Sequence, residues 1–85
     1  MEKLENLKKK LVYRSSYRGT KEMDLLLSSF VKFYINKLTA KDLYELEKFL
    51  EISDEDISNF YYNNVSTQTL KKNIFSELLK KFKIS

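Results

Sequence analysis

Both arginines of the chain, Arg14 and Arg18, lie within five residues of its only glycine, Gly19. A guanidinium group can hold a carboxylate or a cluster of carbonyl oxygens through parallel hydrogen bonds. A glycine beside it lets the backbone of another molecule approach closely, because no Cβ stands in the way. Together with the neighbouring Tyr17, these residues could therefore form a loop that contacts a protein partner.

The same segment also has a purely structural interpretation, and the sequence leaves both open. Gly19 could end a first helix by adopting a positive φ, and Thr20 could cap the next helix. Arg18 and Glu22 have the i, i+4 spacing of an ion pair on a helix surface. Glu22 and Asp24 would also interact favourably with the positive end of a helix dipole.

The composition excludes most other chemistry. The chain has 85 residues, with no Cys, no His and no Pro. Disulfides, thiolate nucleophiles, imidazole bases and the usual zinc ligand sets are therefore excluded. We expect neither a metal site nor the chemistry of a catalytic triad. A chain of this length also allows only one domain.

Segments for membrane insertion and export are not apparent in the sequence. The longest aliphatic run is the three leucines at 25–27, whereas a spanning helix needs about 20 apolar residues. The N-terminus has lysines at 8–10 instead of the apolar stretch of a signal peptide. We therefore expect a soluble protein of a bacterial cytoplasm, without membrane insertion.

Apolar residues at helical spacing predict an all-α fold, a single compact five-helix bundle-like domain with short loops. Hydroxyl residues between apolar neighbours mark the starts of the last three helices; they are Thr39, Ser53 and Ser66. The predicted helices cover about 2–13, 21–37, 40–51, 54–63 and 67–82.

Two of these helices have patterns that predict how they pack. The helix at 21–37 is apolar nearly all round, which is typical of the buried centre of a small bundle. The helix at 67–82 should turn one stripe inward, comprising Leu70, Ile74, Leu78 and Phe82. Three consecutive aromatic residues, at 60–62, cannot all face inward from a short helix. At least one of them should be exposed, where aromatic side chains favour contact with a partner.

Charge is divided along the chain. Residues 1–22 have seven basic and three acidic side chains, and residues 61–85 have five and one, whereas residues 40–60 have two basic and seven acidic ones. The basic ends permit a nucleic-acid-binding or antitoxin-type helical domain. The C-terminal lysines could equally form a solvated face. A general helical adaptor is a further alternative.

The sequence resembles a known family in two blocks. Residues 18–22, followed by Asp24 and the leucines at 25–27, resemble the Arg-Gly-x-x-Glu signature of the succinate dehydrogenase assembly factor family, the small flavinylation factors of bacteria and mitochondria. Residues 50–60 resemble its second block, in which an acidic turn leads to an aromatic residue. Many members have Trp where this chain has Ser16 and Phe60.

This resemblance implies a helical assembly factor, not an enzyme. Such a factor binds the flavoprotein subunit of succinate dehydrogenase, or of fumarate reductase, and promotes covalent attachment of FAD to it. It would have no tightly bound cofactor of its own, because it acts on FAD held by the partner. We expect it to be a monomer when free and not to bind nucleic acid.

The partner-binding residues come from the two matching blocks and from the segment that directly precedes the first of them. The loop bearing Arg18 and Gly19 is expected to insert toward the flavin site of the partner, with Glu22 orienting Arg18 or touching the partner itself. The predicted contact residues are Arg14, Tyr17, Arg18, Gly19, Glu22, Asp24, Asp54, Asp56 and Phe60.

Overall fold

Helices make up all the regular structure in the computed structural model, which describes residues 2–83. Within those residues there are six α-helices, one 3₁₀ turn and no strand. The 3₁₀ turn, Ile35–Lys37, continues the second helix. The helices are α1 (Glu2–Ser15), α2 (Lys21–Tyr34), α3 (Ala40–Leu50), α4 (Asp54–Asn63), α5 (Gln68–Lys71) and α6 (Ile74–Lys81).

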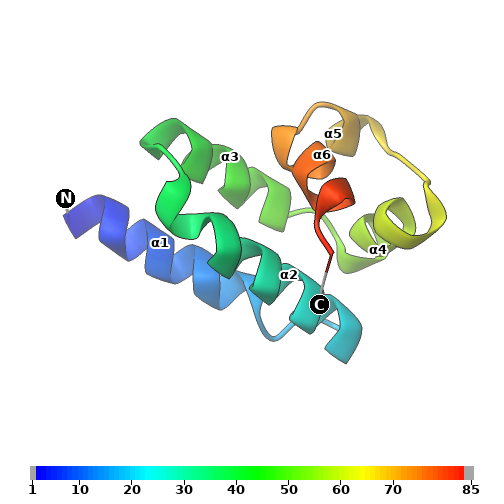
Figure 1. The fold of residues 1–85 in the computed structure, drawn as a ribbon, viewed down its shortest axis with the longest axis horizontal. Coiled ribbons are helices and arrows are strands. Elements are labelled where there is room, and N and C mark those ends of the chain that lie inside the picture. Colours follow the sequence, from blue (N-terminus) through cyan, green and yellow to red (C-terminus); the bar gives the residue numbers. More distant parts are fainter. Residues whose placement is uncertain (1, 84–85) are drawn as a thin grey trace.

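The first three helices form one part of the molecule, and α4–α6 gather beside them (Figure 1). Helix α1 packs against both α2 and α3, and α3 also packs against α6. The two parts meet through three buried rings, Phe30 of α2, Phe49 of α3 and Phe75 of α6, whose centroids are 6.2 to 6.4 Å apart. The all-α fold is as predicted from the apolar spacing.

Side-chain caps fix most of the helix starts. Thr20 accepts a hydrogen bond from the backbone N–H of Met23, which confirms it as the cap of α2. Thr39 and Asp42 form the complete reciprocal capping box at the start of α3. Ser53 caps α4 by accepting from the N–H of Asp56. These caps depend only on residues three positions away, so the sequence was sufficient to predict them.

The predicted fifth helix, 67–82, is wrong as a single element. The structure breaks it at Lys72 and Asn73, and its cap is Thr67 rather than Ser66. Asn73 is 8% exposed. Its side-chain oxygen accepts from the N–H of Phe75 at 2.9 Å, and its amide donates to the carbonyl of Glu45 at 3.3 Å. This amide starts α6 and ties it to α3.

The break also changes which residues of this segment face inward. Leu70 is fully buried as predicted, but Ile74 is 54% exposed, and Phe75 and Leu79 are buried in its place. A restart of the helix at Asn73 rotates the following residues relative to a continuous helix. The inward position predicted for Ile74 is therefore wrong.

Helix α2 is less completely buried than predicted. Its inner residues Leu26, Leu27 and Phe30 have no exposed surface, but Leu25 and Phe33 are each more than half exposed. Lys37 covers part of the Phe33 ring, with Nζ 3.9 Å from the ring centroid. One side of α2 therefore lies on the molecular surface and shows apolar side chains there. Among the described residues, no helix combines the length and apolarity of a membrane span.

Candidate functional site

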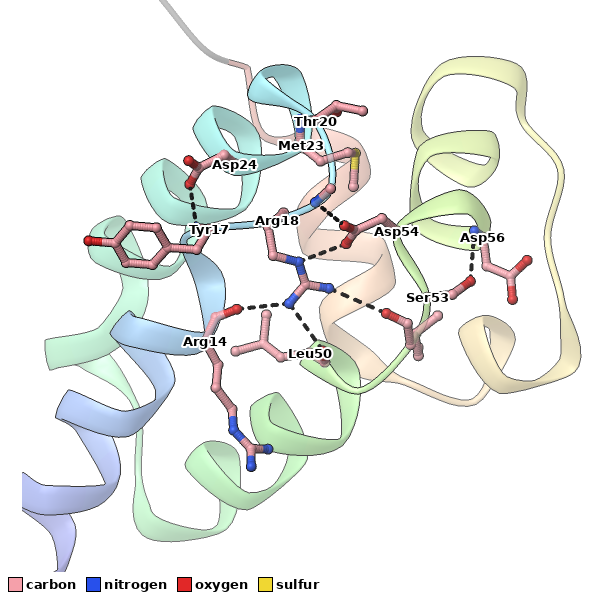
Figure 2. Close-up of polar contacts among 12 residues, drawn as sticks. Arg14, Tyr17, Arg18, Thr20, Met23, Asp24, Leu50, Ser53, Asp54 and Asp56 are labelled. Carbon is pink, nitrogen blue, oxygen red and sulfur yellow. Dashed lines mark hydrogen bonds and ion pairs between the residues drawn. The ribbon is translucent and has the colours of Figure 1, made fainter.

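The loop between α1 and α2 lies against the junction between α3 and α4 (Figure 2). The contact joins the two sequence blocks, because Arg18 belongs to the first and Asp54 to the second. Nε of Arg18 donates to Oδ1 of Asp54 at 2.7 Å, and the N–H of Gly19 donates to Oδ2 at 2.7 Å. One carboxylate therefore holds both residues of the Arg-Gly pair.

The remaining hydrogen bonds of Arg18 go to backbone carbonyls. Nη1 donates to the carbonyl of Arg14 at 2.8 Å and to that of Leu50 at 3.3 Å, while Nη2 donates to that of Ile52 at 3.4 Å. Four of the five guanidinium N–H groups thus have partners within the protein. The side chain is only 12% exposed. Arg18 cannot offer its fork to a partner without giving up these bonds.

We call this arrangement the arginine clamp, defined by Arg18, Gly19 and Asp54 with the carbonyls of residues 14, 50 and 52. It satisfies the free carbonyls at the ends of α1 and α3, which have no partner within their own helices. It also holds the start of α4, because Asp54 is the first residue of that helix. Three helix ends are therefore joined through one guanidinium group.

Two structural roles proposed from the sequence, the positive φ of Gly19 and the ion pair between Arg18 and Glu22, are wrong, whereas Glu22 and Asp24 do lie in the first turn of α2. Gly19 has no positive φ; the left-handed conformation is found at Tyr17, with φ of 58°, and at Asn64. In the described residues no ion pair joins Arg18 to Glu22, because Asp54 takes the guanidinium. Gly19 is instead constrained by space, since a Cβ there would lie 3.2 Å from Oδ2 of Asp54.

Tyr17 lies on the outer side of the same loop and points away from Arg18 (Figure 2). It is 80% exposed, and its ring packs against that of Tyr13, with centroids 5.4 Å apart. Its N–H donates to Oδ1 of Asp24 at 3.0 Å, which holds the left-handed conformation. A bulky residue at positive φ is strained, so the fold maintains an exposed aromatic side chain at an energetic cost.

Arg14 and Glu22 flank this loop as exposed charges. Nη1 of Arg14 lies 3.8 Å from Oε2 of Glu51, and both side chains remain accessible to water. Glu22 is exposed at the start of α2.

The pKa of Tyr62 on α4 is raised from its ordinary value. Burial is the largest cause, and the negative charges of Glu22 and Tyr61 raise this pKa further. Tyr62, 50% exposed, is the outward member of the aromatic run at 60–62, as predicted.

Two predicted contact residues lie apart from this loop. The side chain of Asp56 points away from the arginine clamp (Figure 2) and lines a separate cleft with Lys48 and Thr69. Phe60 is half-buried against the core. Lys80 covers it, with Nζ 5.0 Å from the ring centroid and 2.6 Å from the carbonyl of Phe60. The structure therefore groups seven of the nine predicted residues around one loop.

The sequence interpretation missed Tyr13 and the mutual contact of the two blocks. Tyr13 forms the support for the Tyr17 ring, and its spacing of four residues from Tyr17 was the available signal. Nothing in the sequence showed that Asp54 would bind Arg18, 36 residues away. Within the part of the chain that the structure describes, no acidic side chains cluster as metal ligands.

Comparison with known proteins connects this geometry with a family. The family model described as "Flavinator of succinate dehydrogenase" matches residues 9–83. These residues include the loop, the arginine clamp and all of α2 to α6.

Individual relatives agree with this match. "Succinate dehydrogenase assembly factor 2, mitochondrial" of Lodderomyces elongisporus is 43% identical over 63 residues, which are 74% of this chain and 38% of the relative. The protein of the same name from Dictyostelium discoideum is 46% identical over 57 residues, covering 67% and 40%. "FAD assembly factor SdhE" of Acetobacter pasteurianus is 29% identical over 58 residues, covering 68% and 53%. The chain thus spans between about two fifths and one half of the length of these relatives.

Proposed function

The chain belongs to the flavinator of succinate dehydrogenase family, and from this premise we propose that it binds the flavoprotein subunit of succinate dehydrogenase or fumarate reductase and promotes covalent attachment of FAD to it. The chain acts as an assembly factor and not as an enzyme. The FAD remains on the partner, and the bond-making chemistry belongs to the flavin and its acceptor protein. The factor binds as a monomer, in the compartment where the subunit acquires FAD, a bacterial cytoplasm.

The observation that carries this proposal is the strained, exposed position of Tyr17. Its φ of 58° costs stability, and its 80% exposed ring gains little packing in return. Strain of this kind persists where the surrounding structure enforces it and where the strained residue has a role. Exposed aromatic side chains on a rigid support are favourable anchors at protein interfaces. Tyr17 is therefore the proposed centre of the partner contact.

The arginine clamp makes this contact rigid. By fixing Gly19 against Asp54, it holds the backbone on which Tyr17 stands. A preformed loop loses less conformational entropy on binding than a mobile one. The same rigidity would hold the partner's flavin region in one geometry, so that the reacting groups stay close enough to react.

The role of Arg18 in this proposal differs from direct recognition. Its guanidinium group already has Asp54 and three carbonyls as partners, so it positions the loop and does not bind the flavoprotein. Arg14 and Glu22 are exposed at the sides of the loop and are the proposed polar contacts. Asp24 supports Tyr17 by accepting a hydrogen bond from the backbone N–H of Tyr17. Asp56 and Phe60 fall outside the proposed contact.

The test is co-expression of the flavoprotein subunit with variants of this chain, in cells that lack any other such factor. Covalent flavin is read as fluorescence of the subunit on a denaturing gel. Gly19→Arg should abolish the fluorescence, because the Cβ of a long side chain would lie 3.2 Å from Oδ2 of Asp54, and accommodating that side chain would displace the loop on which Tyr17 stands. Gly19→Ala is the matched control and should retain most of it. Fluorescence equal to wild type with Gly19→Arg would refute the proposed contact.

A further inference from the structure

A cleft of about 470 Å³ lies between α1 and the C-terminal part of α2, and Tyr17 of the connecting loop lines it. Its size lies within the range of ligand-binding clefts. Val12 and the buried Ile35 give it an apolar floor. The residues that line it are Glu5, Lys8, Lys9, Val12, Tyr13, Ser16, Tyr17, Lys32, Ile35 and Asn36. We call it the α1–α2 groove.

The two ends of the α1–α2 groove differ in chemistry. Tyr13 and Tyr17, both exposed, form a wall at one end. Three lysines lie along the rest, against a single acidic residue, Glu5, which pairs with Lys8 at 3.6 Å. The groove therefore has an aromatic end and a positively charged end.

The basic residues of α1 divide between two faces. Lys10 is bound to Glu47 at 2.7 Å, and Arg14 lies beside Glu51, so α3 neutralises the charges on that face. Lys9 and Lys32, on the groove, have no ion pair with any acidic side chain that the structure describes. These two exposed ammonium groups are therefore available to bind acidic groups of another molecule.

The length of the groove indicates the kind of molecule that fits. Helix α1 advances by about 15 Å from Glu5 to its end at Ser15, at about 1.5 Å per residue, and Tyr17 lies just beyond that end. An extended peptide covers that distance with about five residues, at about 3.3 Å each. A nucleic acid would place phosphates along the whole length, but the lysines occupy only one part of it. An acidic peptide with one aromatic or aliphatic side chain matches both ends.

We propose that the α1–α2 groove binds an acidic segment of the flavoprotein subunit, with its carboxylates toward Lys9 and Lys32 and an apolar side chain between Tyr13 and Tyr17. This inference rests on the proposed function for the identity of the partner. The acidic segment then lies next to the Tyr17 contact, and the two sites act together. Tethering of this kind raises the effective concentration of the second contact.

The first test uses peptide probes and does not depend on the partner. The 15N-labelled chain is titrated with the capped peptide Asp-Glu-Phe-Asp-Glu and followed by NMR. The largest shifts should fall on the amides of residues 8–17 and 32–36. The neutral peptide Asn-Gln-Phe-Asn-Gln should bind at least tenfold more weakly. Equal binding of the two peptides, shifts elsewhere, or tighter binding of a single-stranded DNA oligonucleotide would overturn the groove proposal.

The second test uses the complex with the flavoprotein subunit. The double variant Lys9→Glu with Lys32→Glu should weaken the complex at least tenfold at low salt. It should also remove most of the salt dependence of the affinity, because salt weakens binding by screening the attraction between exposed charges and the variant lacks that attraction. Lys41→Glu with Lys83→Glu changes the total charge equally at exposed positions outside the groove, and should weaken the complex by less than threefold. Equal weakening by both double variants would overturn the proposal.

These tests separate the groove from the proposed function. If peptides fail to bind but Gly19→Arg still abolishes covalent flavin, the groove proposal is wrong and the function stands. If acidic peptides bind as described but covalent flavin does not depend on this chain, the assignment of the partner is wrong.

Discussion

The inner and outer sides of the α1–α2 loop contain neighbouring residues with opposite environments. Arg18 points inward and is 12% exposed, with four hydrogen bonds to Asp54 and three carbonyls. Tyr17 points outward and is 80% exposed, with one aromatic neighbour and a strained backbone. The difference teaches that the arginine of a sequence signature can hold a loop in place, and in the proposed function the residue before it makes the contact.

The largest effect should come from removing the guanidinium group. Arg18→Ala leaves Oδ1 of Asp54 and the carbonyls of residues 14, 50 and 52 without the guanidinium donor, while Oδ2 of Asp54 keeps the N–H of Gly19. We expect the free energy of unfolding to fall by about 2–4 kcal/mol, because breaking a largely buried ion pair strands its partner. Urea denaturation followed by circular dichroism measures it. A loss below about 0.5 kcal/mol would mean that the clamp is only a surface pair.

A smaller effect should follow from Asp54→Asn. The amide keeps one oxygen for Arg18 but turns its NH₂ group toward the N–H of Gly19, so that two donors face each other. The expected loss of unfolding free energy is about 1–2 kcal/mol, measured in the same way. A double-mutant cycle with Arg18→Ala should show coupling, because the two residues share one network. If the losses of the two single variants simply add in the double variant, Arg18 and Asp54 do not stabilise the fold through one shared network.

Gly19→Ala tests whether the glycine is required by conformation or by space. Its φ is not positive, so alanine can adopt the backbone conformation, and the new Cβ would lie 3.2 Å from Oδ2 of Asp54. A side-chain carboxylate can move by a few tenths of an ångström, and alanine also restricts the unfolded chain. We expect the unfolding free energy to change by less than about 1 kcal/mol. A loss above that, by thermal unfolding, would show that Asp54 cannot move.

The ability of the sequence to predict this structure depended on the distance between interacting residues. The caps at Thr20, Thr39 and Ser53 join residues three positions apart, and all were predicted. The clamp joins Arg18 to Asp54 across 36 positions, and no local pattern indicates that contact. Residue propensity predicted the left-handed backbone conformation at Gly19. The structure has it at Tyr17, where the hydrogen bond from the N–H of Tyr17 to Asp24 holds it.

The break in the last helix has the same origin. A continuous apolar stripe from Leu70 to Phe82 predicted a single element, although Asn73 is of a residue type that often caps a helix start. The amide of Asn73 reaches the carbonyl of Glu45, 28 positions away, and caps α6 at the same time. Contacts between distant segments decided this boundary. The nine candidate residues were identified by side-chain chemistry and by family resemblance, but their division into inward and outward groups required the structure.

The smallest predicted effect concerns the ion pair between Lys10 of α1 and Glu47 of α3. This pair serves as an exposed comparison for the more buried ion pair of the arginine clamp. The hydrogen bond from Lys10 lowers the pKa of Glu47 from its ordinary 4.5, opposed by desolvation and assisted by the charges of Lys10 and Arg14. Because the folded pKa is lowered, this stabilisation is present above pH 4.5 and is lost as the pH falls through the folded pKa. Glu47→Gln should cost about 0.5 kcal/mol at pH 7 and nothing in acid.

Urea denaturation of Glu47→Gln and wild type between pH 3 and pH 7 measures this difference. The gap between the two proteins should narrow as the pH falls below about 4.5. A constant gap would show that the carboxylate charge is not the source of the stabilisation.

The most direct test of the account is calorimetric binding of the purified flavoprotein subunit to wild type, Tyr17→Asn and the control Tyr44→Asn, whose ring is 56% exposed on α3. Asparagine tolerates positive φ, so Tyr17→Asn should unfold at a temperature no lower than wild type. We predict that it binds at least tenfold more weakly, while Tyr44→Asn binds as wild type does. Wild-type affinity for Tyr17→Asn would contradict the claim that the outer side of the loop makes the contact.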